Sequence, residues 1–308
     1  MKLPFATGTI LLFLLVIFST VFFGMIIALV ELITPLGEHT KLFISQIGTW
    51  LIPTLLFARY AYERMWDDLK LKNFGKWSDY GWFILLAVIY YPFAVYMQKI
   101  NEAMTFPESM AGIEQFLRNM EQQAEAVMMR MVSGTSPTDL ALALLNMAIL
   151  PAICEELFFR GVVLNNLMKR TSRIHSSVWL SAILFSFIHF QFYGFLPRLI
   201  MGAVLGYAFV LSKSLWVPIL LHFLKNATVT GTDYLDNTNR ISQDPHTMDT
   251  KTATLWMAVL SLIASITILW CATSCRNKRH SSCEETALSD PPQYASLQYD
   301  ADYPEHKS

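Results

Sequence analysis

Eight apolar segments constrain the fold of this 308-residue chain more than any other feature. A hydrocarbon layer about 30 Å thick is crossed by about 20 apolar residues in a helix. Only 15% of the residues are charged, against roughly a quarter in a soluble domain. We therefore predict an all-α fold, a polytopic membrane helix bundle with about eight transmembrane helices. The expected spans cover residues 9–33, 42–60, 82–97, 140–168, 178–192, 197–211, 215–230 and 255–271.

The first three spans each carry a feature that needs an argument. The segment 9–33 exceeds the apolar core of about 7–15 residues in a signal peptide, which favours a retained helix. Pro53 and Pro92 lie inside the second and third segments. Neighbouring helices can satisfy the backbone groups that proline frees, so both segments remain predicted spans.

A polar insertion separates the third span from the fourth. Its apolar residues recur at helical spacing, which predicts an amphipathic extramembrane helix that lies on the membrane or over the bundle. These residues are Ile113, Phe116, Leu117, Met120, Ala124, Val127, Met128 and Met131. The expected organisation is N-terminal helices in 1–100, the insertion in 101–137, a core in 138–232, a loop and last helix in 233–275, and a disordered cytoplasmic tail in 276–308.

Lysine and arginine are unevenly distributed between the two sides of this bundle. With eight spans both termini share a side, and the segments on that side carry most of the Lys and Arg. Cytoplasmic segments are enriched in these residues, so we expect cytoplasmic termini in a plasma (inner) membrane. The net charge of −1 gives no indication of a nucleic-acid partner; the expected partner is the lipid bilayer.

Ionisable and amide side chains interrupt three of the core spans. They are Glu155, Glu156 and Arg160 in the fourth, His189 in the fifth, and His222 and Asn226 in the seventh. Such residues within a membrane are costly and by default indicate a functional site. Counting along the helices at 1.5 Å per residue places all three groups in the cytoplasmic half of the bilayer. We expect them to converge.

The residue types indicate hydrolysis of a peptide bond by activated water. Glu156 and Arg160, four apart on a helix, can form an ion pair, which leaves Glu155 facing another direction. Burial favours proton uptake by a carboxylate, which suits a general base. A neighbouring imidazole can orient the water or shuttle a proton. His222 and Asn226, also four apart, could donate hydrogen bonds to the oxyanion of a tetrahedral intermediate.

These three groups also carry a resemblance to a known family. Glu155-Glu156-x-x-x-Arg160, Phe185-x-x-x-His189 and His222-x-x-x-Asn226 resemble, in order, the motifs of the CPBP intramembrane proteases, which include CAAX prenyl endopeptidases and bacteriocin-processing or abortive-infection types. The resemblance covers about residues 140–231. It implies an eight-helix bundle in which Glu155, His189, His222 and Asn226 are catalytic and Glu156 and Arg160 support them. Its implied substrate is a membrane-bound or lipidated peptide.

Two questions stay open at this point. Members of the family are described both as glutamate proteases and as metalloproteases, and Glu155, His189 and His222 could form a His2Glu zinc site. We favour a reaction that needs no cofactor, because the sequence lacks His-Glu-x-x-His and His222 with Asn226 suits an oxyanion pair. A non-catalytic membrane scaffold or immunity protein is the alternative from another class. A proton-coupled transporter is disfavoured because the polar groups share one level.

Overall fold

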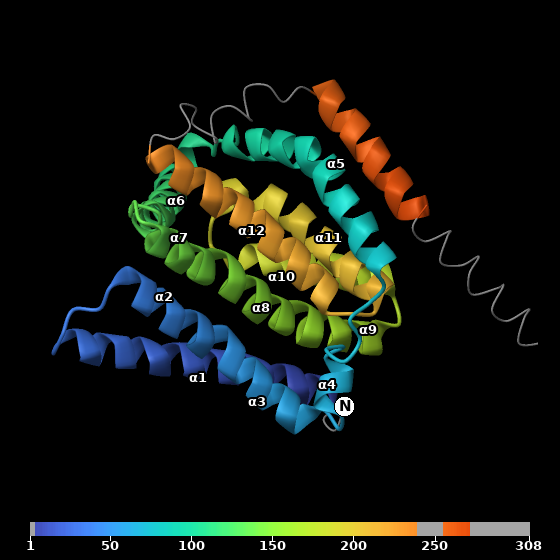
Figure 1. The fold of residues 1–308 in the computed structure, drawn as a ribbon, viewed down its shortest axis with the longest axis horizontal. Helices are drawn as coiled ribbons and strands as arrows, with labels where there is room; N and C mark the ends of the chain where they lie inside the picture. The colour runs from blue at the N-terminus through green and yellow to red at the C-terminus, as the bar shows by residue number, and fades with distance from the viewer. Residues whose placement is uncertain (1–3, 239–254, 272–308) are drawn as a thin grey trace, which may run out of the picture. The chain divides into compact units, whose positions relative to one another are not determined.

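The computed structural model describes residues 4–238 and 255–271, and regular structure in these ranges is entirely helical (Figure 1). The chain divides into two compact units, Met1–Ser265 and Ile266–Ser308. The predicted tail 276–308 and most of the predicted loop before the last helix lie outside the described residues. The helices up to residue 237 belong to the first unit, and the helix Leu255–Cys271 crosses the boundary between the units.

Twelve labelled α-helices account for the first unit up to residue 237 within the described ranges. They are α1 (Phe5–Glu31), α2 (Glu38–Gln46), α3 (Ile52–Ala61), α4 (Met65–Asp68), α5 (Trp77–Glu102), α6 (Ala111–Met131), α7 (Pro137–Leu144), α8 (Leu150–Glu156), α9 (Asn165–Thr171), α10 (Ile174–Phe187), α11 (Phe195–Ser212) and α12 (Trp216–Asn237). A further apolar helix covers Leu255–Cys271.

Each predicted span contains a helix, although the fifth is shorter than the predicted 178–192 because α10 ends at Phe187. Five described helices are long and apolar enough to cross a membrane. These five are Thr7–Glu31, Glu38–Ala61, Trp77–Glu102, Pro137–Thr171 and Phe192–Ser212. The helices Ile174–Phe187 and Leu255–Cys271 are shorter. The 22-residue α12 is interrupted by charged residues and is not among the five. The helical membrane bundle is therefore confirmed, while the count of eight spans stays a prediction.

The helix Pro137–Thr171 joins α7, α8 and α9 through two π-helical segments, Leu145–Ile149 and Leu157–Leu164. Ser136 caps its start, because the Ser136 hydroxyl accepts a hydrogen bond from the Asp139 N–H at 3.2 Å. A π segment widens the helix by one residue per turn and is frequent at functional sites. The second segment begins directly after Glu156.

Helices α10 and α11 approach each other closely at two glycines. A Cβ atom on Gly206 would lie 2.9 Å from Val178 Cγ1, and one on Gly202 would lie 3.1 Å from the Ala182 backbone. The spacing of Gly202 and Gly206 in the sequence, four residues apart, is a small-xxx-small pattern, which predicts close helix packing. That contact is present, because only a residue without a side chain fits at this distance. This close approach brings the Gly202 backbone near the centre of the bundle.

The predicted amphipathic helix is present as α6. The residues of its predicted apolar face from Leu117 to Met131 are buried or half-buried, whereas Ile113 and Phe116 near its start are exposed. The helix contacts α2 and the turn Phe192–Gly194 that precedes α11. The insertion thus packs against the turn between α10 and α11.

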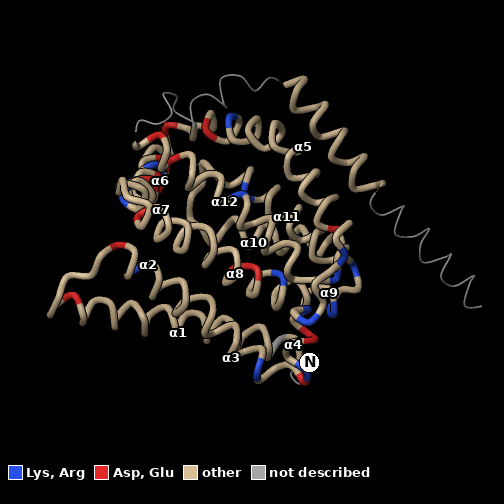
Figure 2. Tube along the Cα trace, viewed as in Figure 1, with Lys and Arg blue, Asp and Glu red and all other residues tan. Residues whose placement is uncertain are grey.

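Charged residues collect toward the helix ends, as Figure 2 shows for the described part of the chain. At the end of α8 and in the segment after it, acidic and basic residues instead lie together. The apolar core around this charge pair includes Phe57, Phe159, Val178 and Phe209. A charge pair inside such a core needs its own partners, and these partners define the candidate site.

Candidate active site

The centre of the site is a buried ion pair within the helix Pro137–Thr171. Arg160 Nη1 lies 2.8 Å from Glu156 Oε1, and the two side chains are 1% and 0% exposed. The spacing of four residues brings them onto one face of the helix. The predicted pair is therefore confirmed, and its mutual neutralisation offsets part of the cost of burying both charges.

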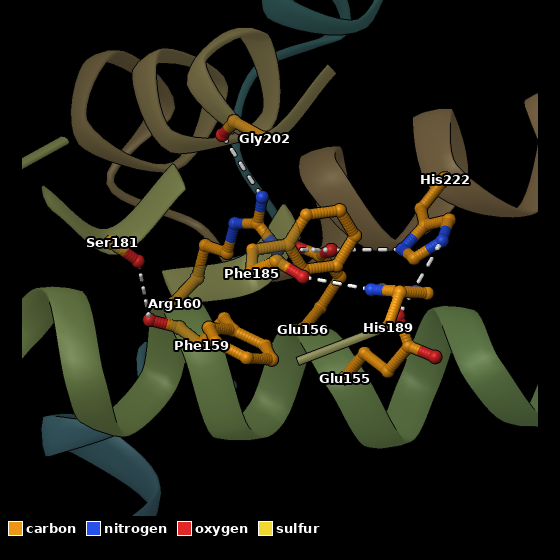
Figure 3. Close-up of polar contacts among 9 residues, drawn as sticks. All are labelled: Glu155, Glu156, Phe159, Arg160, Ser181, Phe185, His189, Gly202 and His222. Carbon is orange, nitrogen blue, oxygen red and sulfur yellow. Dashed lines mark hydrogen bonds and ion pairs between the residues drawn. The ribbon is translucent and has the colours of Figure 1, made fainter. Parts of the chain in front are cut away.

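Arg160 is held by two further groups from α10 and α11. Its Nη2 donates to the Gly202 carbonyl oxygen at 3.0 Å, and the guanidinium lies over the Phe185 ring at 4.8 Å from the centroid (Figure 3). A guanidinium in this position gains a cation–π interaction. Arg160 thus ties α10 and α11 to the helix that carries both glutamates.

His222 joins the site from α12. Its Nδ1 lies 2.9 Å from Glu156 Oε1, so one carboxylate oxygen contacts both Arg160 and His222 (Figure 3). Because an ionised carboxylate only accepts hydrogen bonds, Nδ1 of His222 carries the proton in this contact. The other ring nitrogen, Nε2, is thereby directed away from Glu156.

Glu155 lies on the side of the ring that Nε2 faces. Glu155 Oε2 is 4.0 Å from His222 Nε2, and both side chains are buried. This distance is too long for a direct hydrogen bond but within ion-pair range. The two adjacent glutamates therefore contact opposite nitrogens of a single imidazole.

His189 follows the last turn of α10. Its Nδ1 donates to the Phe185 carbonyl oxygen at 2.8 Å, because a carbonyl can only accept. The neutral ring then has an unprotonated Nε2 that can accept a hydrogen bond from water. The His189 and His222 rings both pack edge-on against the Phe185 ring, with centroid distances of 5.2 and 5.9 Å. Figure 3 draws His189 between His222 and Glu155 in this view.

The fourth predicted catalytic residue, Asn226, is positioned differently from the others. It lies one turn after His222 on α12, half-buried, and makes no hydrogen bond or ion pair with the described residues. Glu155, Glu156, Arg160 and His222 are thus joined by direct contacts, and His189 is linked to them through Phe185. The Asn226 side chain is free to bind another molecule.

Phe185 and Gly202 belong to the site although the sequence assigned them no chemistry. Phe185 contacts both imidazoles and the guanidinium, and Gly202 supplies a carbonyl acceptor. The motif spacing of Phe185 and His189 was a signal for the first residue. The second was predicted only as a packing glycine, because a sequence pattern does not show which backbone carbonyl meets a distant side chain.

The described residues contain no group of three His, Cys, Asp or Glu side chains that is gathered closely enough to hold a metal ion. His222 and His189 each use only Nδ1 in their contacts with Glu156 and the Phe185 carbonyl, so Nε2 of both rings stays available. A ring whose Nδ1 donates in this way can still bind a metal through Nε2, so the zinc set of Glu155, His189 and His222 stays an open alternative.

The part of the chain that holds the site is similar to a known protein family. The family model described as type II CAAX prenyl endopeptidase Rce1-like matches residues 137–228. No curated protein and no solved structure matches the chain. The matched residues include all six predicted site residues and support an intramembrane endopeptidase in general. Residues 137–228 are thus similar to the Rce1-like type II CAAX prenyl endopeptidases.

Proposed function

We propose that this protein is an intramembrane endopeptidase that hydrolyses a peptide bond in a membrane-bound or lipidated protein with water activated by Glu155. The observation that carries the proposal is the contact of Glu155 and Glu156 with opposite nitrogens of the His222 ring, at 4.0 and 2.9 Å. This contact lies within the residues that match the endopeptidase family.

Glu155 acts as the general base and then as the general acid. Its carboxylate takes a proton from water as the oxygen bonds to the scissile carbonyl carbon. It then gives the proton to the leaving amine when the C–N bond breaks, so protons and charge balance over the cycle. Glu156 stays ionised throughout, because Arg160 and His222 both donate to it.

The imidazoles and Asn226 position the water and stabilise the intermediate. His189 Nε2 accepts a hydrogen bond from the attacking water, since Nδ1 is engaged with Phe185. His222, when protonated on both nitrogens, donates from Nε2, and the unpaired Asn226 amide supplies a second donor to the oxyanion. This division of roles requires that Nε2 carry a proton while Nδ1 donates to Glu156.

An apolar cavity beside the site supports a substrate with an attached or embedded hydrocarbon. It has a volume of about 680 Å³ and is lined by residues of α5, α8 and α12, including Trp216 at the start of α12. Ala152 and Ile153 in its wall lie three and two residues before Glu155, and Ile219 and Phe223 lie three residues before and one after His222. A cavity of this size with aromatic walls fits an apolar chain, and an apolar chain bound there would bring its attached peptide toward Glu155.

Glu155→Gln tests the reaction directly in cells. The membrane peptides of cells with wild-type protein are compared by mass spectrometry with those of cells carrying Glu155→Gln. We expect uncleaved precursors to accumulate in the variant, because glutamine cannot accept the proton of water. Glu125→Gln on α6 is the matched control, since it makes the same chemical change at an exposed position.

Three outcomes separate this proposal from the alternatives. Identical peptide profiles with full biological function in Glu155→Gln would favour a non-catalytic membrane scaffold or immunity protein. Activity lost on chelation and restored by Zn2+ would move the mechanism to a metalloprotease. Cytoplasmic termini in the plasma membrane, which the distribution of Lys and Arg supports, are checked by labelling of terminal tags from either side.

A further inference from the structure

Asn101 lies in the last turn of α5, far from the catalytic motifs in sequence, and its side chain is buried and fully used. Its Nδ2 donates to the Phe192 carbonyl oxygen at 2.9 Å, and its Oδ1 accepts from the Leu196 N–H at 2.8 Å. Asn101 is 1% exposed. One amide thus joins the turn Phe192–Gly194 to the first turn of α11.

This turn determines where His189 is held. The residue after His189, Phe190, has φ +52°, in the left-handed region that side chains with a Cβ rarely adopt. A bulky residue keeps such a conformation only when the surrounding structure fixes it. The next residue, Gln191, is held by Arg198 of α11, which donates from Nη1 to the Gln191 side-chain oxygen at 2.8 Å. Asn101 then holds the backbone groups of Phe192 and Leu196.

Further contacts to the turn come from α5 and α6. Glu121 of α6 accepts from the Tyr193 N–H at 3.3 Å, and Gln98 of α5 donates to the Tyr193 carbonyl at 3.2 Å. Arg118 of α6 lies over the Tyr193 ring at 4.4 Å. The two Asn101 hydrogen bonds are shorter than those of Glu121 and Gln98, and the Asn101 side chain is almost fully buried, so Asn101 helps to fix the position of the turn.

We infer that Asn101 is a positioning residue for His189: by fixing Phe192 and Leu196 it holds the turn that sets the His189 ring against Phe185 and beside Glu155. The role belongs to the long N-terminal part of the chain, because Asn101 lies outside the matched residues 137–228. The effect on catalysis rests on the proposed function, in which His189 orients the water. The effect on the His189 ring does not.

Asn101→Ala tests this role with two independent measurements in detergent or nanodiscs. The first is the 15N NMR signal of the His189 ring in histidine-labelled protein, assigned with His189→Gln. The second is the kcat and KM for an internally quenched, farnesylated peptide. We expect a shifted or broadened His189 signal, and a fall in kcat on the order of 10–100-fold with little change in KM, because small displacements of a catalytic group reduce turnover strongly.

Asn165→Ala is the matched control. Asn165 is also a buried amide that donates to a backbone carbonyl, that of Asp68 at 2.8 Å, but it does not contact the turn after His189. We expect a comparable loss of thermal stability without a change in the His189 signal. If Asn101→Ala does not fold, Asn101→Asp replaces it, since the carboxylate keeps the acceptor for Leu196 and loses the donor for Phe192.

The outcomes distinguish this role from the proposed function. An unchanged His189 signal in the folded Asn101 variant would overturn the positioning role, whatever the activity. An unchanged kcat in a variant whose His189 signal moves would also overturn it as a catalytic influence. If wild-type protein cleaves no peptide, the proposed endopeptidase reaction fails for that substrate, and the NMR comparison still decides whether Asn101 positions His189.

Discussion

Two apolar helices of this protein, α1 and Pro137–Thr171, differ in how much of each helix is buried inside the protein. In α1, 11% of the residues in the most apolar stretch are buried, against 50% in Pro137–Thr171. The first helix is the more apolar and exposes its side chains, including Phe18 and Ile17. The second is less apolar and buries Glu155, Glu156 and Arg160. Hydropathy alone thus indicates contact with lipid, whereas buried charge indicates the site.

Among the substitutions that test this comparison, Glu155→Gln is expected to have the largest effect, which is a loss of peptide turnover. It removes the proposed base from the buried helix, and general acid–base catalysis contributes on the order of 10²–10⁴-fold. Turnover of a quenched, lipidated peptide should fall by about that factor while the thermal unfolding midpoint stays close to wild type. Phe18→Leu on α1 is the control and should retain full turnover. Full activity of Glu155→Gln would remove the distinction between the two helices.

The next effect is on stability, from Arg160→Leu. The substitution leaves the carboxylate of Glu156 buried without its cation, and breaking a buried pair in this way costs about 3–5 kcal/mol. Unfolding in mixed detergent and SDS micelles measures the change. The double variant with Glu156→Gln should be more stable than Arg160→Leu alone, because no uncompensated charge remains. Equal stability of the single and double variants would contradict the structural role of the pair.

A smaller difference in stability is expected between alanine substitutions at two glycines, Gly206 in the packed helix α11 and Gly24 in the exposed helix α1. Gly206→Ala places a methyl group 2.9 Å from Val178 Cγ1, and overpacking of this kind costs about 1–3 kcal/mol. Gly24 of α1 has no atom within 4 Å of an added Cβ among the described residues, so Gly24→Ala should change stability by no more than about 0.5 kcal/mol. The same unfolding assay compares them. An equal cost at both positions would show that the α10–α11 contact is loose.

The smallest effect is expected on removal of metal ions. The described residues lack a three-ligand group, so treatment with the membrane-permeant chelator 1,10-phenanthroline should leave peptide cleavage unchanged. A non-chelating phenanthroline isomer controls for effects of the compound on the membrane. Recovery of a lost activity by added Zn2+ would contradict the metal-free reaction and assign a metal to the buried helix.

The helices could be predicted from the sequence, because long apolar runs leave a backbone in lipid few alternatives to helical hydrogen bonding. The Glu156–Arg160 pair followed in the same way from the four-residue spacing on one helix. The contacts of His222 did not. The sequence paired it with Asn226 as an oxyanion donor, whereas in the structure its Nδ1 contacts Glu156 and Asn226 has no described partner. The catalytic roles themselves remain predictions.

The sequence by itself determined that this chain is a helical membrane protein and which polar residues interrupt its apolar helices. Both properties depend on neighbours along the chain, through hydropathy and helical periodicity. Only the tertiary structure decided that one imidazole lies between two adjacent glutamates, that the Gly202 carbonyl meets Arg160, and that Asn101 holds the turn after His189. Those contacts join residues that lie 42 to 95 positions apart in the sequence. Only the packing of helices against one another brings such residues together.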